Sequence, residues 1–179
     1  MTQDQEVITG PVLETERLRL RRLTEDDAPF ILRLLNDPSF LASIGDKGVH
    51  TLKQAREYIR TGPAESYHRH GFGQDLVELK ESGVPIGTCG LLKRDLLEHP
   101  DIGYAFLPEF WSRGYAVEAA AAVLARAHGP LGLDTVLAVT SLDNAASARV
   151  LERIGFAARE EIEWTGGERV RLFAARKGA

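Results

Sequence analysis

The sequence predicts a mixed α/β (α+β) domain, and two observations support this fold class. Apolar residues recur every second position in some segments and every third or fourth position in others, which indicates strands and helices respectively. The predicted order is strand, two helices, three strands, helix, strand, helix and two strands. This order is not a regular βαβ array, and it gives about seven strands and about four helices.

Length and composition limit the class of protein. The chain has 179 residues, 44% hydrophobic and 27% charged, as expected for one domain with a sizeable core. Its net charge of -4 gives no overall attraction to nucleic acid or to an anionic membrane. No apolar run approaches the roughly 20 residues that span a bilayer, and the N-terminus lacks the layout of a signal peptide. Because Cys89 is the only cysteine, no disulfide can form within the chain, and we expect a cytoplasmic protein.

The N-terminal part is predicted to hold a flexible lead-in, residues 1–12, before a single domain over residues 13–179. Leucines then alternate with Arg17, Arg19 and Arg21, which is the pattern of a strand with one buried face. We expect the arginine stripe of this strand to face solvent.

Two helices are predicted next. Thr24 and the acidic residues after it cap the first, whose apolar residues keep helical spacing. Thr51 and Gln54 have capping-box spacing for the second helix. We expect the Gly-Pro pair at residues 62–63 to stop that second helix.

The rest of the chain alternates between strands and helices, separated by turns rich in glycine. Strands are predicted at residues 75–80, 85–92, 101–106, 135–140, 156–164 and 169–175. Helices are predicted at residues 116–128 and 145–154. Hairpin turns are predicted at residues 81–83 and 166–167.

A turn of small residues between the strand at 101–106 and the helix at 116–128 is the most informative feature for function. Gly114 and Ala116 leave little side chain where the backbone enters the helix. The N–H groups of a first helical turn are unpaired and carry positive partial charge, so they can hold a phosphate or pyrophosphate. Glu118, in that first turn, is expected to favour the helix dipole.

Three motifs together resemble the GNAT acyltransferase superfamily. They are the turn WSRGYAVEA at 111–119, the segment NAASARVLERIGF at 144–156 and the opening LETERLRLR at 13–21. The set looks most like the branch of ribosomal-protein alanine and serine N-acetyltransferases, and it covers about residues 13–175. The resemblance implies a strongly curved mixed sheet, splayed between its fourth and fifth strands, with helices on both faces and acetyl-CoA as co-substrate in the split.

The resemblance also implies which groups hold acetyl-CoA. Backbone groups at the end of the fourth strand would pair with the pantetheine arm: Ala105, Phe106 and Leu107. Backbone N–H groups of the turn would hold the pyrophosphate: Ser112, Arg113, Gly114, Tyr115 and Ala116. The Arg113 side chain either adds charge there or stays solvated. Trp111 replaces the usual Gln or Arg of the family, a change that leaves a main-chain cradle intact. Asn144 would reach the pantetheine or its neighbouring backbone, and a helix N-cap role is open beside this one.

The catalytic residues implied by the resemblance are a serine and an aspartate. Many members protonate the departing CoA thiolate with a tyrosine, but that position is Leu151 here. A serine at the Ser147 position is proposed instead in the resembled branch, and a structural helical serine is the alternative. Asp101 stands where the branch often has glutamate, and it could act as general base through a water. The alternative for Asp101 is a solvated or capping residue at the strand end.

These features predict an acetyl-CoA-dependent N-acetyltransferase in which an amine attacks the thioester directly, with no covalent enzyme intermediate. A backbone N–H near Phe106 would polarise the carbonyl. The acceptor is a protein N-terminal amine or a small amine of antibiotic or polyamine type, and a non-catalytic CoA-binding module is the alternative from another class. We expect a monomer or homodimer with no nucleic-acid or membrane partner. We expect no metal, because His68 and His70 alone make a weak signal.

Overall fold

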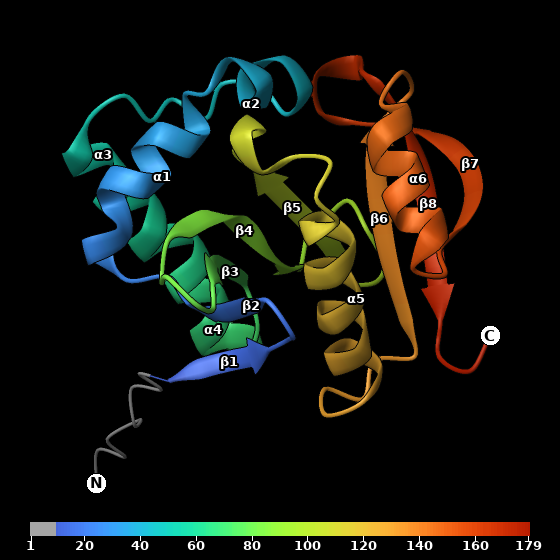
Figure 1. Ribbon diagram of the computed structural model, residues 1–179. Helices are drawn as coiled ribbons and strands as arrows, with labels where there is room; N and C mark the ends of the chain where they lie inside the picture. The colour runs from blue at the N-terminus through green and yellow to red at the C-terminus, as the bar shows by residue number, and fades with distance from the viewer. Residues whose placement is uncertain (1–9) are drawn as a thin grey trace, which may run out of the picture.

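The chain folds into one open sheet flanked by helices, as a computed structural model describing residues 10–179 shows (Figure 1). Within those residues the sheet has eight strands in the order β1-β2-β3-β4-β5-β6-β8-β7. Neighbouring strands are antiparallel except for β5 and β6, which are parallel. The strands are β1 (Pro11–Glu14), β2 (Leu18–Arg22), β3 (Gln74–Leu79), β4 (Pro85–Leu92), β5 (Asp101–Phe106), β6 (Thr135–Ser141), β7 (Ala157–Glu163) and β8 (Arg169–Arg176).

Helices cover both faces of the sheet. Val77 on β3 packs in the same hydrophobic cluster as Val123 of α5 and Leu151 of α6, whereas the adjacent Leu76 packs with Ile31 of α1. Because adjacent strand residues point to opposite faces, α5 and α6 lie on one side and α1 on the other. The α-helices are α1 (Ala28–Leu35), α2 (Pro38–Ser43), α3 (Leu52–Ile59), α4 (Glu65–His70), α5 (Tyr115–His128) and α6 (Ala145–Arg153).

The mixed sheet predicted from the sequence is confirmed, and each predicted strand is present as one of β2 to β8. β1 was not predicted. It pairs with β2, Pro11 opposite Arg21 and Glu14 opposite Arg19, so residues 11–12 of the predicted lead-in belong to the sheet. Residues 1–9 of that lead-in lie outside the described residues.

The sequence prediction was wrong about the end of the second helix. α3 continues through a π-helical segment, η2 (Arg60–Ala64), directly into α4. Pro63 lies inside η2, where the wider turn accommodates a ring that would clash with a carbonyl in a regular α-helix. The helix ends only at Gly71, whose φ of 75° is left-handed. The unpredicted α2 is capped by Asp37, which accepts a hydrogen bond from Ser39 N–H (2.9 Å).

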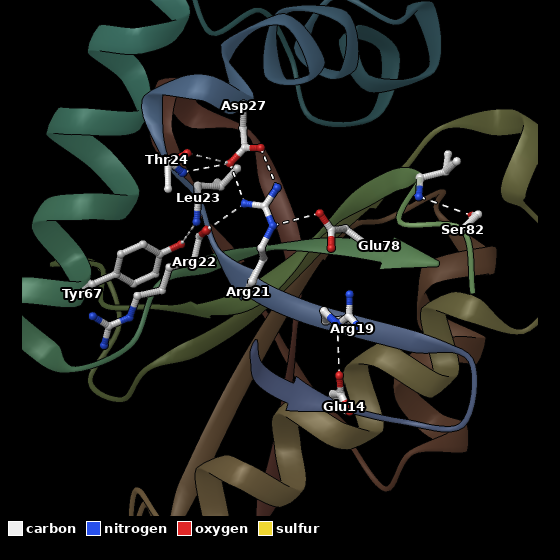
Figure 2. Close-up of polar contacts among 11 residues, drawn as sticks. Glu14, Arg19, Arg21, Arg22, Leu23, Thr24, Asp27, Tyr67, Glu78 and Ser82 are labelled. Atoms are coloured by element: carbon white, nitrogen blue, oxygen red, sulfur yellow. Dashed lines mark hydrogen bonds and ion pairs between the residues drawn. The ribbon is translucent and has the colours of Figure 1, made fainter. Parts of the chain in front are cut away.

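The arginine stripe of β2 binds carboxylates, which corrects the expectation that it only faces solvent (Figure 2). Arg21 donates to both carboxylate oxygens of Asp27 (2.9 and 2.8 Å) and to Glu78 Oε1 (2.9 Å). Arg19 donates to Glu14 Oε1 (3.0 Å). These pairs link β2 to β1, to β3 and to the 3-10 turn η1 (Glu25–Asp27). The stripe therefore helps to fix the position of β2.

β5 and β6 separate after a single pairing, so the sheet is splayed there, as the resemblance implies. Among the described residues their one register pair is Asp101 with Leu137, and Leu137 N–H donates to Pro100 O (2.9 Å). β4, on the other side, pairs with β5 along its whole length. We call the Asp101 side the closed end of the split and the Phe106 side its open end. Towards the open end, one edge of β5 has main-chain groups that β6 does not pair.

Candidate active site

A cleft of about 940 Å³ lies at the open end of the split. Its walls come from α2, the end of β5, the turn before α5 and one side of α6. Most of the residues predicted for the site line this cleft: Ala105, Phe106, Ser112, Gly114, Tyr115, Ala116, Asn144 and Ser147. Asp101, Leu107 and Arg113 are not among the lining residues.

Among the three predicted pantetheine-binding residues, Phe106 is the one whose main chain faces the split. The Leu107 N–H donates to Ile86 O (3.0 Å), so Leu107 points its main-chain groups at β4. Ala105 does the same, because a Cβ added to Gly87 on β4 would lie 2.3 Å from the Ala105 carbonyl oxygen. Main-chain groups alternate in direction along an antiparallel pair, so those of Phe106 point away from β4. The structure therefore brings only one of the three predicted pantetheine-binding backbones to the open edge.

The Trp111 side chain reaches back to this open edge. Its indole Nε1–H donates to the Phe106 carbonyl oxygen (2.8 Å), and 52% of the residue is exposed. A carbonyl oxygen has two lone pairs, so Phe106 O can accept a second hydrogen bond. The unusual tryptophan thus contacts the site through its side chain, which the motif comparison did not indicate.

The turn between β5 and α5 presents unpaired N–H groups to the cleft. Ser112 (φ 59°) and Gly114 (φ 81°) both have left-handed backbone conformations. Gly114 is the N-cap of the 14-residue α5 and makes no side-chain cap. No described residue accepts a hydrogen bond from the N–H groups of residues 112–117. Aligned N–H groups of this kind, at the positive end of a helix, form an anion-binding site.

Arg17 and Glu118 hold this turn in place from the β1–β2 side. Glu118 accepts hydrogen bonds from Thr15 Oγ1 (2.6 Å), Arg17 N (2.9 Å) and Arg17 Nε (2.7 Å). Arg17 Nη1 donates to Arg113 O (2.9 Å), and the guanidinium lies 4.5 Å from the centroid of the Tyr115 ring. We call this set the Arg17–Glu118 clamp.

The clamp changes the role assigned to Glu118. Burial acts to raise the pKa of Glu118, but the hydrogen bonds from Thr15 and Arg17 outweigh burial and hold the pKa below its usual value. The carboxylate is therefore charged and bound to the first segment of the domain. Beyond favouring the helix dipole, it ties the opening motif to the turn, which sequence spacing alone did not reveal.

Asn144 and Ser147 sit together at the start of α6. Asn144 Oδ1 accepts a hydrogen bond from Ser147 N–H (3.1 Å), so the N-cap role left open by the sequence is present in the structure. The Asn144 amide nitrogen keeps its two donors for the cleft. Ser147 Oγ lies 2.8 Å from the Tyr104 hydroxyl, a contact that the sequence did not predict.

Asp101 lies at the closed end, away from Ser147. It is 0% exposed, and its Oδ1 accepts a hydrogen bond from Arg94 Nε (3.1 Å). Its Oδ2 is buried with no partner among the described residues. Burial raises the pKa of Asp101 to about 6, although the Arg94 guanidinium opposes the shift. Asp101 and Tyr104 are three positions apart on one strand, so they point to opposite faces about 10 Å apart along the strand.

Two arginines of α6 add positive charge to the cleft and were not singled out from the sequence. Arg149 and Arg153 line the cleft and stand one helical turn apart. Within residues 10–179, neither forms an ion pair. Asp143 is the one acidic side chain among the lining residues, so the cleft as a whole favours an anionic ligand.

No group of three or more His, Cys, Asp or Glu side chains within residues 10–179 is placed to hold a metal ion. None of the helices described is long and apolar enough to cross a membrane.

Comparisons with known proteins agree with the geometry. A family model described as an acetyltransferase (GNAT) domain matches residues 17–157. The chain is 32% identical over 148 residues to the uncharacterized N-acetyltransferase YoaA of Bacillus subtilis, which covers 82% of each chain. The crystal structure of an acetyltransferase from Agrobacterium tumefaciens strain C58 is similar with a TM-score of 0.80 and 27% identity, covering 98% of this chain and 99% of that one.

Two further solved structures share the fold at lower identity. A ribosomal L7/L12 alpha-N-protein acetyltransferase in complex with coenzyme A has a TM-score of 0.80 and 17% identity, with 93% of this chain and 97% of that chain covered. A chimera of the spermidine N-acetyltransferase of Vibrio cholerae and hSSAT has a TM-score of 0.73 and 18% identity, with 90% and 96% covered. At these identities the likeness concerns the fold alone.

Proposed function

Because the chain belongs to the GNAT acetyltransferase family, we propose that it transfers the acetyl group of acetyl-CoA to a primary amine in the cleft at the open end of the split. One observation carries the donor half of this proposal. The N–H groups of residues 112–117 have no acceptor among residues 10–179 and stand at the N-terminus of α5, beside the cleft. Such groups are suited to a pyrophosphate.

The other walls of the cleft fit the rest of acetyl-CoA. The Phe106 main chain faces the split, where an extended pantetheine arm would lie along β5 as an added strand does. The free Asn144 amide donors face the same space. Arg149 and Arg153 supply charge for phosphate groups. These features support acetyl-CoA as the donor bound between β5, α5 and α6.

The proposed reaction is a direct attack. The neutral amine nitrogen attacks the thioester carbonyl carbon, and the Phe106 N–H donates a hydrogen bond to the oxyanion that forms. The C–S bond then breaks with its electron pair going to sulfur. Ser147 gives its hydroxyl proton to the sulfur and recovers one from water, and the surplus proton of the amine neutralises the hydroxide that remains.

Asp101 is proposed to take the surplus proton of the amine through water. A water is needed because Asp101 does not line the cleft. Two properties support the role: an Oδ2 with no hydrogen-bond partner in the described part of the chain, and a pKa that burial raises to about 6, near the operating pH of a general base.

We propose a protein N-terminal amine as the acceptor. The cleft mouth carries exposed apolar side chains, Ile44 (46% exposed) and Trp111 (52%), which suit a peptide. A polyamine would need several carboxylates, and Asp143 is the one among the lining residues, which also include Arg149 and Arg153.

Release of free thiol from acetyl-CoA tests the proposal. We expect the wild type to release thiol with peptides that carry a free N-terminal alanine or serine, faster than with spermidine, and not with N-terminally blocked peptides. Faster reaction with spermidine would assign a small-molecule acceptor. Binding of acetyl-CoA without thiol release for any amine would indicate a CoA-binding module. Acetyl-CoA at 100 times its Kd should stabilise the fold by about 2.7 kcal/mol, and no shift at millimolar concentration contradicts the donor site.

A further inference from the structure

The Tyr104 hydroxyl crosses the split from β5 to α6. It lies 2.8 Å from Ser147 Oγ and 3.3 Å from the Ser147 carbonyl oxygen. Both residues line the cleft, and they come from its opposite walls. This contact is made at the open end, where β5 and β6 no longer pair with each other. It therefore links the two walls at the place where the thioester is proposed to react.

The number of hydroxyl hydrogens on Tyr104 and Ser147 restricts which of the two residues donates the hydrogen bond. The phenol and the serine hydroxyl have one hydrogen each, and the Ser147 carbonyl oxygen can only accept. When the Ser147 hydroxyl donates to a ligand in the cleft, its hydrogen is no longer available to Tyr104. The 2.8 Å contact is then a hydrogen bond only if the Tyr104 phenol donates to Ser147 Oγ.

We propose that Tyr104 is a positioning residue for the acetyl transfer: its phenol donates to Ser147 Oγ and thereby directs the Ser147 hydroxyl hydrogen toward the leaving sulfur. The inference rests on the function proposed above. Hydrogen bonds in a chain polarise one another, so the Ser147 hydroxyl becomes a stronger donor to the thiolate that forms as the C–S bond breaks. Tyr104 itself keeps its proton throughout.

Two features of the surroundings support this arrangement. Burial raises the pKa of Tyr104 to about 12, so the phenol keeps its hydrogen at neutral and mildly basic pH. Leu151, one turn after Ser147, is 1% exposed in the hydrophobic core and does not line the cleft. The hydroxyl group next to Ser147 is thus supplied by the strand and not by the helix.

A double-mutant cycle tests the coupling. Tyr104→Phe removes one oxygen atom, and we expect kcat to fall about tenfold while the KM for acetyl-CoA stays within twofold, as for an interaction used mainly in the transition state. Ser147→Ala should cause a similar loss. The double variant should be no slower than Ser147→Ala alone, because Tyr104 acts through Ser147. Full kcat in Tyr104→Phe, or two losses that multiply, would overturn the inference.

Tyr67→Phe is a matched control. Its hydroxyl also makes buried hydrogen bonds, accepting from Leu23 N–H (3.0 Å) and donating to Gln74 O, but Tyr67 does not line the cleft. This control should lower the melting temperature and leave kcat unchanged at a temperature where the protein is folded. If Tyr67→Phe lowers kcat as much as Tyr104→Phe does, the Tyr104 effect is structural and the inference fails.

The ionisation of bound CoA tests the same contact without an acceptor. Free thiols of this kind have a pKa of about 8.5, and a hydrogen bond from Ser147 should lower the pKa of the bound CoA thiol. We expect Tyr104→Phe to return it toward the free value, measured from the pH dependence of CoA affinity, with desulfo-CoA as the control ligand. An unchanged pKa in Tyr104→Phe contradicts the inference. Failure of the wild type to bind CoA or to release thiol contradicts the proposed function instead.

Discussion

The two ends of the split between β5 and β6 are built differently. At the closed end, β5 and β6 pair, Asp101 is fully buried against Arg94, and one carboxylate oxygen has no partner among the described residues. At the open end, the strands part, and the polar groups of Phe106, the α5 turn and Ser147 face a cleft. The difference shows how one strand can serve two purposes: the Asp101 carboxylate at the closed end lies outside the cleft, while the polar groups at the open end line it directly.

The largest effect is expected from the turn at the open end. Gly114→Ala places a Cβ at a φ of 81° and 3.3 Å from Arg17 Nη2, which should shift the turn and disrupt its N–H array. We expect acetyl-CoA binding to weaken about 100-fold, the equivalent of about 2.7 kcal/mol. Titration calorimetry measures this.

Gly132→Ala provides the control for Gly114→Ala. Gly132 also has a left-handed φ (64°), with open space around it, and it does not line the cleft. Both variants should lose comparable stability, about 1 to 2 kcal/mol, from backbone strain. Equal weakening of acetyl-CoA binding in the two would show that the turn has no special role.

The sequence predicted the local features of the open end and missed those that depend on contacts between distant segments, for physical reasons. The α5 turn and the Asn144 cap are local, so their spacing is visible in the chain. The direction of the Leu107 N–H depends on register with β4, and the contact of Tyr104 with Ser147 joins residues 43 positions apart. No local sequence pattern indicates either of these contacts.

The same distinction between local and long-range features explains which elements of the fold were predicted. Most of the seven predicted strands and the four predicted helices are marked by apolar runs or apolar periodicity. β1 and α2 are too short to show a period. The Gly-Pro pair at 62–63 is an ordinary stop signal, and only packing in three dimensions reveals that a π-helical turn carries the chain past it.

The second largest effect is expected on the pH dependence of stability, through Asp101 at the closed end. The folded-state pKa of Asp101, about 6, is above the ordinary aspartate value of 3.8, so the folded protein binds more protons between these values. Stability should therefore fall as pH rises from about 4 to about 6, by up to about 3 kcal/mol from this group. Urea unfolding of Asp101→Asn at pH 4.5 and 7.5 should show a smaller fall than in the wild type.

Asp75→Asn is the matched comparison for this pH effect. Asp75 is buried on β3, outside the split, and burial raises its pKa to about 6 as well. We expect this variant to remove a similar part of the pH dependence while acetyl-CoA binding stays unchanged. If the stability of Asp101→Asn changes with pH as much as that of the wild type, the buried Asp101 carboxyl does not cause the loss of stability at higher pH.

A smaller effect is expected from the clamp that supports the open end. Arg17→Met removes the bonds to Glu118 and Arg113 while keeping side-chain volume, and acetyl-CoA affinity should fall about tenfold because the turn loses preorganisation. Arg19→Met is the control, since Arg19 pairs with Glu14 and does not touch the turn. Affinity should be unchanged in the control, and an equal loss in both would argue against the clamp.

The smallest effect is expected on the α6 wall. Replacing Arg149 and Arg153 by alanine should weaken acetyl-CoA binding about fivefold at low ionic strength, with little difference at high salt, because exposed charges are screened. Arg159→Ala on β7, outside the cleft, is the control. A loss of affinity that is independent of salt would mean that these arginines act by packing and not by charge.

The most direct test of the central claim is an acetyl-CoA titration followed through the backbone amide signals of the wild type by NMR. We expect the largest shifts at Phe106 and residues 112–117, and small shifts at Asp101 and β1 to β3. The absence of shifts at millimolar acetyl-CoA, or shifts centred on the closed end, would contradict the claim.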